Sequence, residues 1–373
     1  MHGDLREIML WPPRAADGAG DIGGRIRGRA EDFEVVELPA YSADGREGHL
    51  LLTLTKRGLD SEAALAELAR ALRVDRGELG LAGLKDRHAL TTQWISVPAR
   101  AEPRLAALGG RLDTRSGSLA LGAAMAHGHK LRRGHLRGNL FRIVVRDLDL
   151  EFAQAHARAS ACLERLARVG LRNYYGEQRF GHGGRNLAAG LSLITGRGPR
   201  ARKADLKVGA AQAGLFNLLL AERIDRGLLD RVLLGDILHK RATEDRGGGM
   251  FECSEPEVDQ ARLDAGELEL TGPIYGSKLR WPSPGSPAAE LEHASLAALG
   301  IAVGKLERLG RAAPGTRRAL VVRPEQAIVE PEPAPAEAGL GEGLVLRFAL
   351  PAGSYATVLL RELGVPGSLT SSD

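Results

Sequence analysis

Cysteine and aromatic residues are scarce in this sequence. Its 373 residues include two cysteines, Cys162 and Cys253, and 15 aromatic residues (three Trp, five Tyr and seven Phe). Two cysteines do not build the disulfide framework of a small secreted domain, and these two are not spaced as a zinc-binding pair. We therefore expect the protein to work in a reducing, cytoplasmic compartment.

Long hydrophobic runs are also missing. No run approaches the roughly 20 apolar residues that cross a bilayer. The first residues carry mixed charge instead of the apolar core of a secretory signal peptide. We expect neither a membrane span nor export. At 373 residues the chain is too long for one ordinary core, which predicts two domains or one domain with a large insertion.

Acidic and basic residues almost balance, with a net charge of +4, but they are unevenly distributed. The stretch His127–Arg142 contains five Lys or Arg and three His without an acidic residue, and Arg197–Lys207 contains five Lys or Arg with one acidic residue. Acidic residues collect instead in the proline-rich stretch Glu330–Gly339. This separation indicates a positive face that binds a polyanion, and a solvated Arg-rich rim is the alternative.

One acidic residue stands between two cations in a glycine-led loop. Asp86 follows Lys85 and precedes Arg87, and the alternation of polar and apolar residues over 92–97 predicts a strand directly after the loop. Flanking cations favour the ionised form of a carboxylate. Asp86 is therefore a candidate nucleophile or base, although a charged triplet of this kind is more often ordinary surface.

The spacing of apolar residues predicts elements around this loop. Strands are expected from Phe33 to Leu38 and from Leu50 to Thr55, separated by a Gly/Asp turn region and paired antiparallel. Asp60 or Ser61 caps a predicted helix, and a longer helix is predicted from Glu151 to Val169.

The second half of the chain has a different character. From Asn173 to about Arg318, glycine-rich loops alternate with short helical patterns, one of them from Val208 to Ile224, which predicts an inserted domain. Strand-like sequence returns near Ala319. A strand, a turn and a helix capped by Ser354 are expected near the end.

Eight stretches of the sequence carry a resemblance to a known family. Five of them are EDFEVVE (Glu31–Glu37), AGLKDRHALTTQW (Ala82–Trp94), RGNLFRIVVR (Arg137–Arg146), NYYGEQRFG (Asn173–Gly181) and LPAGSYATVLLRELG (Leu350–Gly364). The three shorter ones are AAQAGLFN (Ala210–Asn217), GDILHK (Gly235–Lys240) and TGPIYG (Thr271–Gly276). Together, and in this order, they resemble signatures of the TruD family of tRNA pseudouridine synthases, over most of the chain.

The resemblance implies an α/β fold of the α+β type. A pseudouridine synthase catalytic domain, with a mixed β-sheet flanked by helices, would be interrupted by an inserted TRUD domain. The catalytic domain is expected in residues 1–172 and 319–373, and the inserted domain in residues 173–318. The implied reaction converts a uridine of tRNA, conventionally at position 13, to pseudouridine. Because nothing is oxidised and no atom is lost, no cofactor is expected.

The resemblance also assigns roles to single residues. Asp86 matches the family's catalytic aspartate. Phe33 matches an aromatic residue near the target base, and Asn139 and Phe141 match the N-x-F pair that lines the pocket. Their plainer alternatives are core positions for the two Phe and a turn position for Asn139.

Two positions depart from the family's pattern. Arg27 stands where the family commonly has Lys, and Ala30 where it commonly has Pro. Arginine keeps the positive charge, so we expect Arg27 to retain a role in substrate binding. Lys85 is expected to tune Asp86 or to hold a phosphate. Contacts to the RNA backbone are expected from Lys130, Arg132, Arg133 and Arg137.

The implied chemistry needs one carboxylate near the ribose. An ionised Asp86 could attack C1′, or could stabilise and deprotonate the sugar as the base leaves, and the sequence does not choose between these routes. The uridine must first swing out of its stack, and an aromatic side chain offsets part of that cost. The expected partner is tRNA, bound by a monomer without an obligate protein partner.

Other functions are less well supported by the sequence. An RNA-binding module without chemistry would leave Asp86 as a loop charge. A glycoside-cleaving enzyme usually needs two carboxylates, and the motifs offer one. The histidines of the basic stretch do not favour a metal site, because neighbouring Lys and Arg would repel a dication. The segment Gly300–Leu306 lacks the spacing and the hydroxyl of a P-loop.

Overall fold

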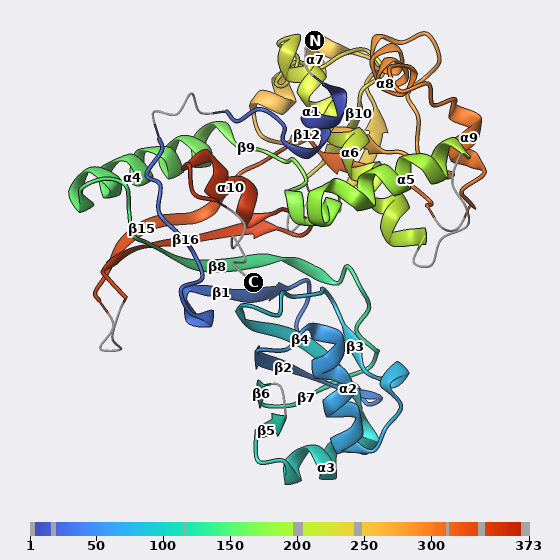
Figure 1. The fold of residues 1–373 in the computed structure, drawn as a ribbon. Coiled ribbons are helices and arrows are strands. Elements are labelled where there is room, and N and C mark those ends of the chain that lie inside the picture. Colours follow the sequence, from blue (N-terminus) through green and yellow to red (C-terminus); the bar gives the residue numbers. More distant parts are fainter. Residues whose placement is uncertain are drawn as a thin grey trace. The chain divides into compact units, whose positions relative to one another are not determined.

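A computed structural model shows the fold (Figure 1) and describes residues 4–15, 20–114, 117–196, 204–241, 248–310, 313–334 and 340–366. The chain forms two compact units. The first unit comprises Met1–Ala15 and Gly170–Val322, and the second unit comprises Ala16–Val169 and Arg323–Asp373. The second unit is therefore interrupted in sequence by the first.

The N-terminal segment groups differently from the expected domain division, which placed it with the residues around Asp86. Helix α1 (Leu5–Leu10) packs on α6 (Ala204–Asp225) of the first unit. The side-chain amide of Asn217 donates to the main-chain carbonyl of Met9 at 2.9 Å, and the Met9 side chain is fully buried. Burial of the apolar face of α1 explains why this segment belongs to the first unit.

A mixed sheet forms the framework of the second unit, with ten strands among the described residues. Their order is β15-β16-β8-β1-β4-β2-β6-β5, with β3 paired to β4 and β7 paired to β2. The strands are β1 (Phe33–Pro39), β2 (His49–Arg57), β3 (Gly80–Leu81), β4 (Leu90–Pro98), β5 (Arg111–Thr114), β6 (Gly117–Leu121), β7 (Met125–His127), β8 (Leu136–Arg146), β15 (Glu325–Glu332) and β16 (Gly343–Pro351). Every strand predicted around the Asp86 loop is present.

Strands β1 and β2 do not pair with each other, which corrects the predicted antiparallel pair. β4 lies between them. It pairs parallel with β1, where Val35 is opposite Thr91, and antiparallel with β2, where Thr55 is opposite Thr92. The hydroxyls of Thr55 and Thr92 are 2.8 Å apart. The glycine-containing connection from β1 to β2 therefore passes a neighbouring strand instead of forming a tight hairpin turn.

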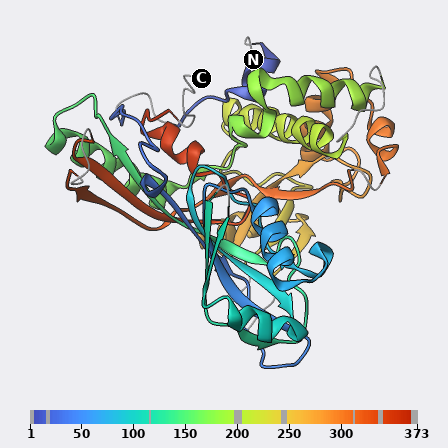
Figure 2. The same cartoon turned by 60° about the horizontal axis from the view of Figure 1, so that its bottom comes forward.

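Helix α2 (Ser61–Leu72) begins where its cap was predicted. The carboxylate of Asp60 accepts the backbone N–H of Ala63 at 2.8 Å, which satisfies one of the free donors of the first turn. The helix ends before Arg73, which has a left-handed backbone conformation (φ 54°). The helix lies beside β2 and β4 (Figures 1 and 2). Its buried leucines share a core cluster with apolar residues of these strands, and they are Leu65, Leu68 and Leu72.

Three further helices of the second unit are α3 (Glu102–Ala107), α4 (Phe152–Val169) and α10 (Ala356–Glu362). Helix α4 spans the predicted range within one residue and packs on β15. The prediction that Ser354 caps the last helix is wrong. Tyr355 occupies the cap position, and the Ser354 hydroxyl is buried without a hydrogen-bond partner among the described residues.

The first unit is organised around α6, whose residues from Val208 to Ala221 are all buried. Its sheet has the strand order β11-β10-β12-β13, and β14 pairs with β9. Its strands are β9 (Leu171–Arg172), β10 (Ile237–Lys240), β11 (Gly249–Glu252), β12 (Leu268–Ile274), β13 (Thr316–Ala319) and β14 (Val321–Val322). Its other helices are α5 (Arg185–Thr195), α7 (Pro256–Asp264), α8 (Pro287–Ala297) and α9 (Val303–Glu307). Among the helices that the structure describes in either unit, none has both the length and the apolar character to cross a bilayer.

Candidate active site

Asp86 lies in the loop between β3 and β4, as predicted. Its side chain is 40% exposed. Oδ2 accepts a hydrogen bond from Nη2 of Arg27 at 2.8 Å, and Oδ1 accepts the backbone N–H of His88 at 3.1 Å. A carboxylate oxygen has two acceptor sites, so both oxygens retain capacity for a further partner. The carboxylate is therefore oriented by the protein and still accessible.

Arg27 is the cation paired with the Asp86 carboxylate. Its side chain is only 12% exposed, and its guanidinium carbon lies 4.5 Å from the centre of the Phe33 ring, within cation–π range. The backbone of Arg27 has φ 64°, a conformation that residues other than glycine rarely adopt. Its contacts to Asp86 and Phe33 hold a strained residue in place, which is a common feature of functional sites.

The two cations beside Asp86 in sequence make other contacts. Nζ of Lys85 forms a buried ion pair with Glu37, and Nε of Arg87 donates to the main-chain carbonyl of Gly58 at 3.1 Å. The cation paired with the Asp86 carboxylate is therefore Arg27, and neither sequence neighbour makes that contact. Lys85 is also mostly buried, with a side-chain exposure of 6%.

The Lys85–Glu37 pair attaches the Asp86 loop to β1. The Glu37 side chain is fully buried and also accepts the backbone N–H of Trp94 in β4 at 3.1 Å. Burial raises the pKa of the Glu37 carboxyl above its ordinary value, while the charge and hydrogen bond of Lys85 oppose that rise. The position of the loop therefore depends on a desolvated charge pair.

Lys56 is a second support of the loop, and it was not identified from the sequence. It is 1% exposed, and its ammonium donates to the main-chain carbonyls of Asp86 at 2.6 Å and Leu59 at 2.7 Å. Burial lowers the pKa of Lys56 to about 8, although the negative charge of Asp86 opposes this shift. The signal was available, because Lys56 follows Leu52 and Leu54 at two-residue spacing and so lies on their buried face of β2.

Phe33 and Phe141, predicted to lie near the target base, are brought together by the pairing of β1 with β8. Their ring centres are 6.4 Å apart in an edge-to-face arrangement, and Phe141 also stacks on Phe348 of β16 at 5.3 Å. Phe33 and Phe141 are 5% and 7% exposed. Both rings are mostly buried and form a packed aromatic group, and the Arg27 guanidinium lies over the Phe33 ring of that group.

Asn139 lies two residues before Phe141 on the same face of β8, opposite Glu37 of β1 and Leu350 of β16. Its side-chain oxygen is buried and has no hydrogen-bond partner among the described residues. Buried polar atoms are nearly always paired, so an unpaired acceptor needs an explanation. A donor on a bound ligand would provide one.

The predicted RNA-contact residues differ in their availability. Arg133 pairs with Glu62 at 2.9 Å, and Lys130 donates to the main-chain carbonyl of Gly77. Arg132 and Arg137 are exposed. Within the described part of the chain, neither of them has an ion-pair partner. In the second basic stretch, residues 197–203 lie outside the described residues, as do residues 335–339 of the acidic stretch.

The histidines of the basic stretch are not gathered like metal ligands. Across the described ranges, no three His, Cys, Asp or Glu side chains are grouped so that they could hold a metal ion. Instead, His127, His129 and His135 line a cavity together with cationic side chains. This arrangement is more suitable for an anion than for a metal cation.

Comparisons with known proteins agree on one family. The family model described as tRNA pseudouridine synthase D (TruD) matches residues 15–204 and 200–363. The tRNA pseudouridine synthase D of an Anaeromyxobacter species is 43% identical over 354 residues, covering 93% of this chain and 94% of that protein. The protein of the same description from Thermus thermophilus is 41% identical, with 92% and 89% covered. That from Pseudomonas aeruginosa is 37% identical, with 96% and 95% covered.

The fold is also similar to that of a solved structure. A crystal structure described as a putative tRNA pseudouridine synthase D from Methanosarcina mazei superposes with a TM-score of 0.72. It covers 98% of this chain and 99% of that chain, at 23% sequence identity. This chain therefore shares its fold with a solved structure.

Proposed function

Because the chain belongs to the tRNA pseudouridine synthase D (TruD) family, we propose that it converts the uridine at position 13 of tRNA to pseudouridine with Asp86 as its catalytic carboxylate. The observation that carries this proposal is the arrangement at Asp86. An accessible carboxylate is held by Arg27, whose guanidinium lies over the ring of Phe33 in a group of packed aromatic rings.

The reaction is an isomerisation at the ribose. The bond from C1′ to N1 of uracil breaks, the base turns, and C5 bonds to C1′; C5 then loses its proton and N1 gains one. Asp86 either attacks C1′ or removes a proton from the sugar as the base leaves. Its two exposed acceptor sites are suitable for both routes, and no external oxidant or reductant is required.

Arg27 orients the carboxylate for this step. Its guanidinium contacts Oδ2 of Asp86 on one side and the ring of Phe33 on the other. We assign Phe33 and Phe141 as positioning residues, because both rings are buried, Phe33 contacts Arg27 and Phe141 packs on Phe33. The amide of Asn139 is the group that recognises the base, with its unpaired oxygen accepting the N3–H of uracil. Lys85 acts through Glu37 on the loop and does not contact substrate.

The wider setting follows from the substrate. We propose that the protein acts in the cytoplasm, where tRNA is found, and that it acts as a monomer. Exposed cations of the basic stretch, led by Arg132 and Arg137, would contact phosphates, and that part of the affinity is sensitive to salt and largely independent of sequence. Light scattering of the free protein and of its tRNA complex tests the monomer.

The experiment compares wild type with Asp86→Asn. Both proteins are incubated with unmodified tRNA, and pseudouridine is mapped in the product. We expect modification with the wild type alone, at a single site, while Asp86→Asn binds tRNA with nearly unchanged affinity, because the amide keeps the shape of the carboxylate but not its charge. If neither protein forms pseudouridine while both bind tRNA, a binding module is the better description. Equal activity of the two proteins would remove Asp86 from the chemistry.

A further inference from the structure

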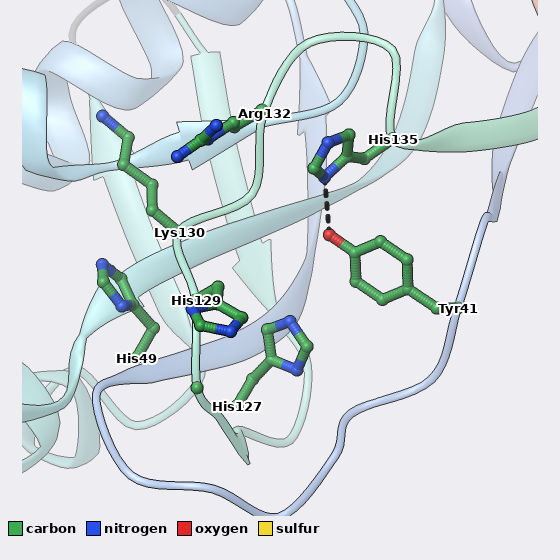
Figure 3. Close-up of a pocket in the computed structure, with 8 residues that line it drawn as sticks. Tyr41, His49, His127, His129, Lys130, Arg132 and His135 are labelled. Atoms are coloured by element: carbon green, nitrogen blue, oxygen red, sulfur yellow. Dashed lines mark hydrogen bonds between the residues drawn. The ribbon is translucent and has the colours of Figure 1, made fainter.

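A cavity of about 580 Å³ lies in the second unit and is separate from the residues assigned to the reaction. Tyr41 follows β1, His49 begins β2 and His127 ends β7, while the remaining wall comes from the connection that leads to β8 (Figure 3). Its lining residues are Tyr41, His49, His127, Gly128, His129, Lys130, Arg132 and His135. The volume is within the range of about 300–1,000 Å³ that is typical of small-ligand sites.

One side of the cavity is aromatic. Tyr41 stacks on His127 with ring centres 5.3 Å apart and an interplanar angle of 17°. Its hydroxyl lies 2.7 Å from Nδ1 of His135 (Figure 3). Although these contacts hold the ring, Tyr41 is still 37% exposed. A fixed and exposed aromatic ring is a platform on which a planar group can stack.

The other side of the cavity is cationic. Lys130 and Arg132 line it, and the lining contains no carboxylate. Lys130 is held by its bond to the Gly77 carbonyl, and its ammonium retains two further donors. Asp44 borders the lining: its carboxylate accepts the backbone N–H of Gly128 at 2.9 Å and lies 3.2 Å from Nδ1 of His127. The lining itself therefore presents donors and positive charge, and the Asp44 carboxylate is engaged by Gly128 and His127.

The environment of His49 is also positively charged. Its Nδ1 is buried and has no hydrogen-bond partner among the described residues. Burial first, and then the charges of Lys130, His127 and His129, hold the pKa of His49 below its ordinary value, with Glu78 opposing them. A positive potential that disfavours a further proton favours a bound anion.

From these observations we infer that the cavity binds one nucleotide of the RNA substrate, outside the position of the isomerised uridine. The base stacks against Tyr41, and its phosphate contacts Arg132, Lys130 and His129. A nucleotide fits better than a free inorganic anion, because the cavity combines a stacking platform with phosphate donors, and single-stranded RNA is recognised in this way. The inference rests on the proposed function, since it takes the ligand to be part of the RNA that is modified.

The cavity wall is joined to the loop that carries Asp86. The backbone N–H of Gly134 donates to the carbonyl of Ala82 at 2.9 Å, four residues before Asp86. Ala82 also packs with Leu131 of the wall in a small buried cluster with Leu51. A nucleotide held in the cavity would therefore fix the RNA strand relative to the catalytic loop, which is the use of remote binding contacts in orienting a substrate.

The test measures binding of an unmodified tRNA transcript to proteins that all carry Asp86→Asn, so that turnover does not interfere. Tyr41→Leu should weaken binding about tenfold, the loss expected for one stacked base, while Tyr41→Phe keeps the ring and should bind within about twofold of the parent. Arg132→Ala should weaken binding and reduce the slope of log affinity against log salt by about one phosphate contact. The matched control is Arg70→Ala. It removes an arginine of α2 that does not line the cavity and whose side chain is 72% exposed.

The outcomes separate this inference from the proposed function. If Tyr41→Leu and Arg132→Ala bind tRNA as the Arg70→Ala control does, the cavity is not a nucleotide site, whatever the wild type does in the pseudouridine assay. If the losses appear but the wild type forms no pseudouridine, the cavity stands and the proposed reaction fails. Amide hydrogen exchange of the wild-type protein provides a second test that does not depend on the folding of any variant. Amide exchange over residues 127–135 should slow when tRNA is saturating, and unchanged exchange there would contradict the inference.

Discussion

The ammonium of Lys56 lies 2.6 Å from the main-chain carbonyl oxygen of Asp86, so a fully buried side chain of β2 holds the backbone of the residue proposed to act on the ribose. The same ammonium binds the carbonyl of Leu59, in the segment that leads into α2. The Lys56 ammonium therefore joins β2, the start of α2 and the Asp86 loop. The position of the loop depends in this way on Lys56, which lies outside the sequence motifs that resemble the family.

Lys56→Met should lower kcat for pseudouridine formation by at least about tenfold while KM changes little. Methionine fills the space but donates no hydrogen bond, so the Asp86 carbonyl loses its partner and the loop loses its position. Steady-state kinetics with tRNA measures both constants, and Lys56→Arg, which keeps the donors, serves as the control for charge. A change confined to KM would show that Lys56 serves RNA binding instead.

The pH dependence of stability should also reveal Lys56. Its pKa of about 8 in the folded protein is below the ordinary lysine value of 10.5, so the unfolded chain binds this proton more tightly. The resulting destabilisation is complete below about pH 8 and is relieved as the pH rises from about 8 to 10.5. Between about pH 7.5 and 9.5, the wild type should therefore gain about 2 kcal/mol of unfolding free energy relative to Lys56→Met. Urea unfolding of both proteins at the two pH values measures the difference, and parallel behaviour would contradict the shifted pKa.

Two replacements of Arg27 should separate its strain from its contacts. Arg27→Ala and Arg27→Gly both remove the guanidinium, so both should lower kcat by about 10- to 100-fold through loss of carboxylate orientation. Only glycine tolerates φ 64° without strain, so Arg27→Gly should be about 1 kcal/mol more stable than Arg27→Ala. Denaturant unfolding and kinetics together provide the comparison. Equal stability of the two variants would mean that the backbone changes conformation once the side chain is lost.

The buried Glu37–Lys85 pair should be strongly coupled in stability. Glu37→Leu leaves the Lys85 ammonium desolvated without a counter-charge and should cost about 3–5 kcal/mol. Replacing Lys85 with Met in the same protein removes the stranded charge and should recover most of that loss. A double-mutant cycle measured by denaturant unfolding gives the coupling energy. Additive losses would show that the two side chains do not depend on each other.

Local sequence patterns were sufficient for much of the second unit. The cap at Asp60 and the leucine spacing of α2 are encoded within a few residues, and the structure confirms both. The glycine-led turn and the alternation of polar and apolar residues over 92–97 likewise placed Asp86 in a loop before a strand. The same kind of pattern could have identified Lys56, but a charged residue at the end of an apolar strand was not expected on its buried face.

The predictions that needed correction all concern longer-range contacts or competing local geometry. The position of β4 between β1 and β2 depends on strand pairing, which no periodicity within one strand specifies. The last helix has its N-cap position at Tyr355, so Ser354 lies one residue before that position. The cavity at Tyr41 is formed by three separate segments of the chain. The sequence therefore indicated the basic stretch, but it did not indicate the aromatic side of the cavity.

Sequence alone was enough to indicate the family, the candidate aspartate and most of the surrounding elements, since caps, periodicity and motifs are properties of neighbouring residues. Only the tertiary structure decided which cation pairs with that aspartate. Arg27, 59 residues away in sequence, pairs with Asp86, while the adjacent Lys85 pairs with Glu37, 48 residues away in sequence. The physical reason is that charges select partners by distance in space and by desolvation, and both are set when the strands of the sheet assemble.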